Sequence, residues 1–126
     1  MTTIAAPPRR PDVLRGSPLP IGGGPVILYA RTARPGRPDV LLGRLRRYAA
    51  RQRCEVTAEI IDHAPPAVPM AHRRQWPRID RLITHGSARG IVTPAWTDVR
   101  YVDRFLTLDA WLDDRRAFLA VTEPER

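Results

Sequence analysis

The run Val26-Ile27-Leu28-Tyr29-Ala30 is apolar at five consecutive positions, and it constrains the fold more than any other segment. A strand that is apolar on both faces is typical of a parallel sheet covered on both sides. Parallel strands also need long crossovers, which are usually helical. The run therefore predicts a buried strand of an α/β domain.

The residues after this run alternate between helical and strand-like patterns. Proline-rich residues 62–75 are expected to form a long loop. The expected strands are 26–30, 54–61, 90–93 and 117–121, and the expected helices are 39–53, 77–85 and a third one that starts at Thr97 or Asp98 and carries Val102, Phe105, Leu108 and Leu112. In the second strand, Val56, Ala58 and Ile60 are expected to share one face. This alternation predicts a doubly wound parallel four-stranded sheet with helices on both faces.

The chain of 126 residues is long enough for one domain with a single core. Residues 1–25 are rich in proline and glycine and poor in large apolar side chains, so we expect a flexible tail there. The folded domain is expected to cover residues 26–124.

The formal net charge is +8, and every one of the 21 basic Lys/Arg positions is arginine. A high-GC coding bias can explain the missing lysines. The excess positive charge attracts polyanions whatever its origin, so duplex DNA is the natural partner to test.

The single cysteine, Cys54, excludes a disulfide within the chain, and His63, His72 and His85 lack the spacing of a metal site. The sequence therefore gives no reason to expect a metal or other cofactor. No run of about 18 apolar residues and no signal-length apolar segment occurs. We expect a cytoplasmic protein without a membrane association, located at the nucleoid if it binds DNA.

Several short segments, in the same order and spacing, resemble the catalytic domain of serine recombinases (resolvases and invertases). Residues 28–33 are similar to the family's Tyr-Ala-Arg-Val-Ser strand, and residues 45–56 to its Leu-Arg-any-Tyr-Ala helix and the Glu-Val strand after it. Arg53 stands where the family usually has glycine. Residues 76–83 resemble Arg-Pro-Gly-Phe-Gln-Arg-Leu-Leu, residues 91–98 the strand before an Asp-Arg motif, and residues 118–124 the last core strand.

The resemblance implies a resolvase-like α/β fold, in which a serine attacks a DNA phosphodiester and arginines stabilise the phosphoryl oxygens. Arg31 and Asp98 match this pattern. Three positions depart from it: Ala33 replaces the nucleophilic serine, Trp76 replaces an arginine, and Val99 replaces another. Thr32 offers a hydroxyl one residue early, but adjacent side chains on a strand point to opposite faces. We therefore expect no catalytic residue and no strand cleavage.

Arginines near the expected carboxyl ends of the strands are the candidates for holding DNA phosphates without cutting. They are Arg31, Arg34, Arg73, Arg74 and Arg100, with Asp98 as the family-matched acidic residue. For Arg31, a structural ion pair to Asp62 or Asp98 is an equally good interpretation.

Other residues also allow two interpretations. Trp76 and Trp96 can stack on bases or serve as buried anchors. Trp111 fits a core or an interface. The stripe of Arg44, Arg47 and Arg51 fits a solvated helix face or a DNA contact.

Three hypotheses of function follow. The first is a catalytically inactive recombinase-like domain that binds DNA, a recombinase or another regulatory protein. The second is a dimerisation module that uses the third helix and Trp111, with no role on DNA. The third is a residual site-specific recombinase. Resolvase-type recombinases continue into a long dimerisation helix and a helix-turn-helix module, and we expect neither in a chain that stops at Arg126.

Overall fold

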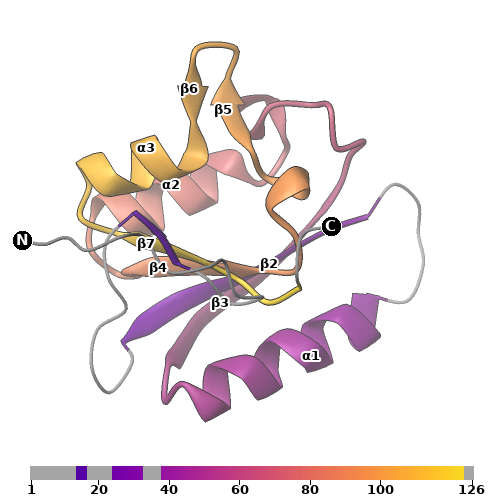
Figure 1. Cartoon of the computed structure of the whole chain (residues 1–126), viewed down its shortest axis with the longest axis vertical. Helices are drawn as coiled ribbons and strands as arrows, with labels where there is room; N and C mark the ends of the chain where they lie inside the picture. Colours follow the sequence, from indigo (N-terminus) through magenta and orange to yellow (C-terminus); the bar gives the residue numbers. More distant parts are fainter. Residues whose placement is uncertain (1–13, 17–23, 33–37, 124–126) are drawn as a thin grey trace, which may run out of the picture.

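The computed structural model describes residues 14–16, 24–32 and 38–123. Within them, helices and strands alternate along the chain (Figure 1). The elements are β1 (Leu14–Gly16), β2 (Pro25–Thr32), α1 (Pro38–Arg51), β3 (Glu55–His63), η1 (Met70–His72), α2 (Trp76–Thr84), β4 (Gly90–Thr93), η2 (Trp96–Asp98), β5 (Tyr101–Asp103), β6 (Leu106–Thr107), α3 (Leu108–Asp114) and β7 (Phe118–Val121).

The main sheet has the strand order β1-β7-β4-β2-β3. The four strands β7, β4, β2 and β3 are parallel, which confirms the predicted parallel four-stranded sheet. The fifth strand, β1, pairs antiparallel with β7 and covers that edge. It comes from within residues 1–25, which the sequence analysis assigned to a tail, because three residues of mixed character carry no strand signal.

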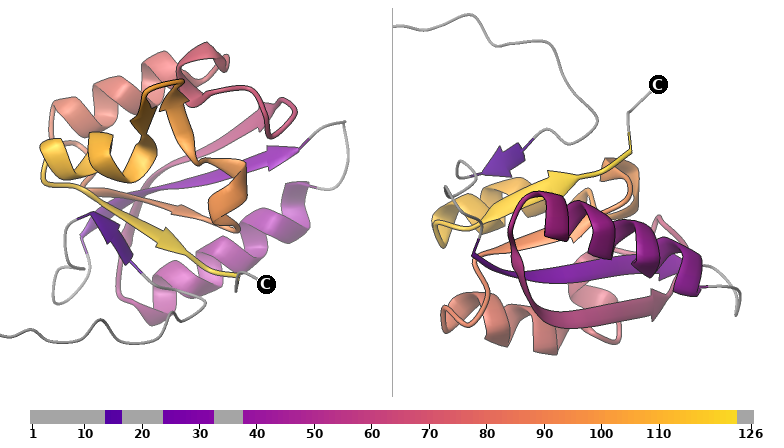
Figure 2. Two further views of the ribbon diagram at one scale, coloured as in Figure 1. Left: turned by 45° about the horizontal axis from the view of Figure 1, so that its top comes forward. Right: turned by 90° about the horizontal axis from the view of Figure 1, so that it is seen from below.

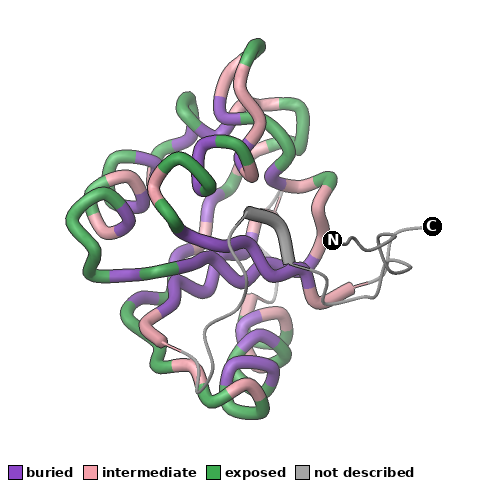
Figure 3. Tube along the Cα trace, turned by 60° about the vertical axis from the view of Figure 1, so that its left-hand side comes forward, coloured by how far each residue is buried: buried purple, intermediate pink, exposed green. Residues whose placement is uncertain are grey.

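Helices cover both faces of the sheet, as predicted: α1 lies on one side, and α2 and α3 lie on the other (Figures 1 and 2). Successive side chains of β2 serve the two sides in turn. Val26, Leu28 and Ala30 pack with α1, whereas Ile27 and Tyr29 pack with α2 and α3. All five are fully buried, so the apolar run at the centre of the sheet has the predicted role (Figure 3).

Helix α1 ends two residues earlier than predicted, at Arg51. The chain turns there through Arg53, whose φ of 58° lies in the left-handed region. The N–H of Cys54 then donates to the carbonyl of Ala49 at 2.8 Å, which closes the helix end. Glycine adopts a positive φ without strain, and this is the physical reason that glycine suits the position that Arg53 occupies.

The prediction of one long third helix from Thr97 or Asp98 is wrong. Residues 96–98 form a single 3-10 turn, and residues 101–107 form the separate β5–β6 hairpin. Only α3, which starts at Leu108, is helical. The carboxylate of Asp103 accepts the backbone N–H of Phe105 at 2.8 Å, and such a local turn competes with helix formation.

The prediction that Val56 shares the buried face of β3 is also wrong. The register between β2 and β3 shifts after Val26, so that Val26 faces Val56 but Ile27 faces Ala58. One extra residue in β3 moves Val56 out of the alternation, and it is 38% exposed while Ala58 and Ile60 are buried.

Two glycines have specific roles. Gly86 follows α2 with a φ of 79°, in agreement with the predicted stop. Gly90 starts β4 against the ring of Phe118, and a Cβ there would lie 2.5 Å from that ring.

In the part of the chain that the structure describes, no helix has the length and apolar character needed to cross a bilayer.

Candidate functional site

The candidate site lies at the carboxyl ends of the parallel strands, where open α/β sheets bind ligands. The chain leaves β2 toward β3 on one side and later reaches β4 on the other side of β2, so the direction of winding changes at β2. Arg31 and Thr32 end β2, Asp62 and His63 end β3, and Thr93 ends β4. These ends gather most of the predicted site residues.

Arg31 links three segments. Its Nε donates to Oδ1 of Asp98 at 3.1 Å, and its Nη1 donates to the carbonyl of Ala64 at 2.9 Å. Both side chains of the ion pair are largely buried, with exposed fractions of 16% and 18%. Of the two interpretations of Arg31, the ion pair to Asp98 is therefore the one present.

Arg73 is buried and holds the loop after β3 in place. Its Nε and Nη2 donate to the carbonyls of Val68 and Pro66, at 2.9 and 3.3 Å. Its Nη1 donates to the hydroxyl of Tyr29 at 3.1 Å. With 4% of its area exposed, this guanidinium is not open to a phosphate.

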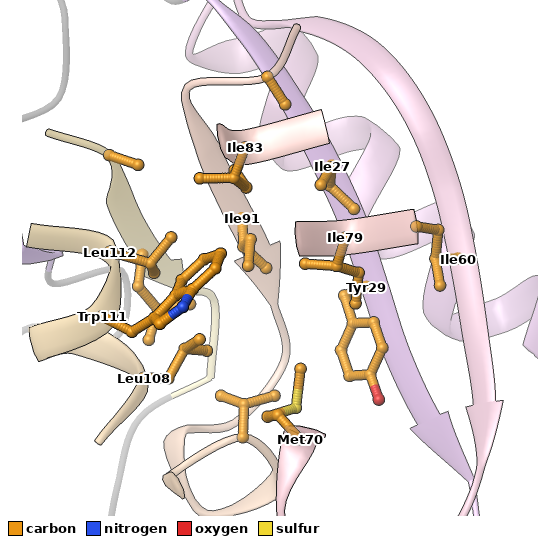
Figure 4. Close-up of a cluster of buried hydrophobic side chains, with 14 of the residues drawn as sticks. Ile27, Tyr29, Ile60, Met70, Ile79, Ile83, Ile91, Leu108, Trp111 and Leu112 are labelled. Carbon is orange, nitrogen blue, oxygen red and sulfur yellow. The ribbon is translucent and has the colours of Figure 1, made fainter. Parts of the chain in front are cut away.

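The Tyr29 hydroxyl connects Arg73 to Asp62. It accepts from Arg73 and donates to Oδ2 of Asp62 at 2.9 Å, while Oδ1 of Asp62 accepts the backbone N–H of Gln75 at 3.1 Å. Burial raises the pKa of Tyr29 far above its usual value, so the phenol stays protonated. Figure 4 shows this hydroxyl pointing away from the surrounding isoleucines, toward the carboxyl end of β2.

Two hollows flank the loop 62–75. One, of about 660 Å³, has His63, His72 and Arg74 in its wall. The other, of about 380 Å³, has Arg100 and Tyr101 in its wall. Val68 lines both hollows, so they adjoin. Arg74 and Arg100 are exposed, and neither guanidinium has a carboxylate partner among the described residues.

No protein-family model matches the chain, and no curated protein matches its sequence. Among solved structures, it is similar to the crystal structure of the C-terminal catalytic domain of ISC1926 TnpA, an IS607-like serine recombinase. The two superpose with a TM-score of 0.60 at 16% identity, over 81% of this chain and 69% of that chain. The fold is that of a serine recombinase catalytic domain.

Core side chains occupy two of the positions at which the resemblance to serine recombinases implies arginine. Val99 is fully buried. Trp76 is 9% exposed and stacks at a tilt on Trp111, with ring centroids 4.7 Å apart. The buried-anchor interpretation of Trp76 and the core interpretation of Trp111 therefore hold. Trp96 is partly buried against the same core.

Two of the predicted residues lie outside the described part of the chain. They are Arg34 and Ala33, in residues 33–37 between β2 and α1. Among the described residues, no group of three or more His, Cys, Asp and Glu side chains is arranged to hold a metal ion.

The sequence analysis missed the contact between Tyr29 and Asp62 and a buried hydroxyl at Thr93. A tyrosine inside an apolar strand usually bonds a polar partner when buried, and this was the available signal. Thr93 ends β4 with no exposed area, and its Oγ1 has no hydrogen-bond partner among the described residues. The residues around Thr93 in the sequence do not predict that its hydroxyl is buried without a partner.

Proposed function

We propose that this chain is a non-catalytic serine-recombinase-like domain that binds duplex DNA through phosphate contacts. The observation that carries the proposal is that Arg74 and Arg100, exposed and without a carboxylate partner among the described residues, stand in the walls of two adjoining hollows at the carboxyl end of the sheet. Guanidinium groups in such a position suit phosphate oxygens.

The residues at the matched positions support the absence of catalysis. Cleavage by the serine-recombinase mechanism requires a hydroxyl nucleophile, and alanine at position 33 supplies none. The family's mechanism also uses guanidiniums at matched positions to meet the developing charge. Of those positions, Arg31 is bonded to Asp98 and to a backbone carbonyl, and Trp76 and Val99 supply no guanidinium.

The outer face of α2 adds to the positive field. Arg78 and Arg81 are three residues apart on this helix, and both are exposed. The nearest acidic residue on this helix, Asp80, accepts a hydrogen bond from Thr84 at 2.8 Å. The helix therefore presents cations beside Arg74 that can lie along a polyanion.

A dimer through the third helix is less well supported. Its apolar residues Leu108, Trp111 and Leu112 are buried inside the domain, with exposed fractions of 0%, 5% and 0%. The molar mass from light scattering at high salt shows whether the domain dimerises through another face.

The test is fluorescence anisotropy of a labelled duplex at several salt concentrations. We expect weak, sequence-independent binding whose logarithm falls linearly with the logarithm of salt concentration. The double variant R74A/R100A should bind more weakly, and its salt slope should fall by about 2, at roughly 0.9 for each lost phosphate contact.

The matched control removes two exposed arginines from α1, on the opposite side of the sheet, in the variant R47A/R51A. It lowers the net charge equally and should keep the slope of the unmodified protein. Equal loss in both variants, or no loss in either, would contradict the proposed site.

A further inference from the structure

The β5–β6 hairpin stands out from the layer of α2 and α3 as a separate two-stranded unit (Figure 1). Its base is anchored, because Val102 is buried and Leu106 packs against the main core. Its tip carries Phe105, which is 87% exposed and far more open than any other large apolar side chain among the described residues. With Tyr101, which is 45% exposed, it gives this short hairpin two of the four exposed large apolar side chains among the described residues.

The tip has a fixed shape. The carboxylate of Asp103 accepts the N–H of Phe105 at 2.8 Å, so this acid closes the turn. The backbone N–H of Leu108 donates to the carbonyl of Arg100 at 2.9 Å, which closes the open end of the hairpin. The ring is therefore carried at the turn of a hairpin that hydrogen bonds close at both ends.

One cation lies beside the ring, and a second stands at the base of the same hairpin. The guanidinium of Arg104 lies 5.1 Å from the centroid of Phe105. Arg100 stands at the base of the hairpin, in the wall of the smaller hollow, beside Tyr101, which is 45% exposed. A hairpin that carries an exposed ring and two arginines is complementary to stacked base pairs and their phosphates, whereas an apolar protein groove gives those guanidiniums no counter-charge.

We propose that the hairpin inserts Phe105 between adjacent base pairs of bound duplex DNA, with Arg104 and Arg100 on the flanking phosphates. The inference rests on the proposed DNA binding and adds a mode of contact to it. Apolar side chains that enter a base step partly unstack it and bend the duplex. Because phenylalanine offers no hydrogen bond, the insertion favours easily unstacked steps rather than a specific sequence.

The test uses a short duplex with 2-aminopurine at a central step, because the fluorescence of this base rises when it unstacks. We expect the full chain to raise the fluorescence on binding. The variant F105A should abolish the rise and weaken binding by about tenfold, the scale of one lost stacking contact. Its salt slope should not change, because phenylalanine carries no charge.

The conservative variant F105L, which keeps an apolar wedge, should retain part of the fluorescence rise. The matched control is V40A, which removes another exposed apolar side chain, on α1, and should behave as the unmodified protein.

The possible failures are distinct. If F105A binds and unstacks DNA like the unmodified chain while R74A/R100A still loses affinity, insertion is wrong and DNA binding stands. If no duplex binds even at low salt, the proposed function and the inference both fall. If F105A instead changes the molar mass in solution, the ring belongs to a protein interface and insertion is wrong.

Discussion

At the scale of single residues, two buried hydroxyls at the carboxyl end of the sheet differ in how well they are satisfied. The Tyr29 hydroxyl has both a donor and an acceptor, Arg73 and Asp62. The Thr93 hydroxyl has no partner among the described residues although it is fully buried. A satisfied buried hydroxyl stabilises its surroundings, whereas an unsatisfied one carries only the cost of losing water.

Tyr29→Phe should therefore lower the free energy of unfolding by about 1–3 kcal/mol, because it leaves Arg73 and Asp62 short of a partner. The matched variant Thr93→Val has nearly the same shape and should leave stability unchanged or raise it. Urea denaturation measures both. A large loss in Thr93→Val, or none in Tyr29→Phe, would contradict the two assignments.

At the scale of elements, the ends of the helices show which boundaries the local sequence predicts. Pro77 and Gly86 predicted the start and the end of α2 correctly, because the backbone conformation that each residue favours is a local property. The predicted end of α1 lies two residues beyond the observed end, because Arg53 adopts a left-handed backbone conformation that an arginine side chain does not predict. The closing hydrogen bond from Cys54 to Ala49 compensates for the strain.

The variant Arg53→Gly should raise the free energy of unfolding by about 1 kcal/mol, because glycine tolerates a positive φ. The control is Arg47→Gly, at an exposed position within the same helix, which should lower it by about 1 kcal/mol. Thermal or urea unfolding of the two variants checks the opposite signs. Destabilisation by both would show that the Arg53 side chain matters more than its backbone.

The prediction of one long third helix also belongs to the scale of elements, and it is wrong. Three of the four apolar residues at helical spacing, Val102, Leu108 and Leu112, are buried, but they belong to a strand and to a shorter helix. The fourth, Phe105, is 87% exposed at the hairpin turn, so the spacing predicted neither the backbone path nor the burial of every member. The local turn at Asp103 favours a hairpin, and the packing of Val102 and Leu106 against the main core holds the hairpin in place.

At the scale of the whole molecule, the recombinase fold is combined with Ala33, Trp76 and Val99 at three positions where the resemblance implies a serine and two arginines. Arg31 ties β2 to η2 and to the loop after β3, and Arg73 ties that loop to β2. Trp76 and Trp111 fill the core on the same side of the sheet. In our proposal these residues stabilise the end of the sheet, which then serves as a platform for binding.

Restoring the nucleophile alone should therefore not restore cleavage. We expect Ala33→Ser to form no covalent protein–DNA adduct with supercoiled plasmid, because arginine is still missing at positions 76 and 99. Denaturing gels after incubation detect such adducts, which resist detergent. An adduct in Ala33→Ser that is absent from Ala33→Thr and from the unmodified chain would overturn the assignment of these positions as indispensable.

The sequence by itself determined the parallel sheet, the helices on its two faces and the arginines that end up near its carboxyl edge. Those features follow from apolar periodicity and from the alternation of strands and helices along the chain, which are local properties of the sequence. Tertiary structure decided which arginines stay open. Arg73 and Arg74 are neighbours in sequence, yet one is 4% exposed and bonded to Tyr29 while the other is exposed to solvent. The reason is physical: the availability of a guanidinium depends on acceptors supplied by distant segments, and only the folded chain brings those acceptors within reach.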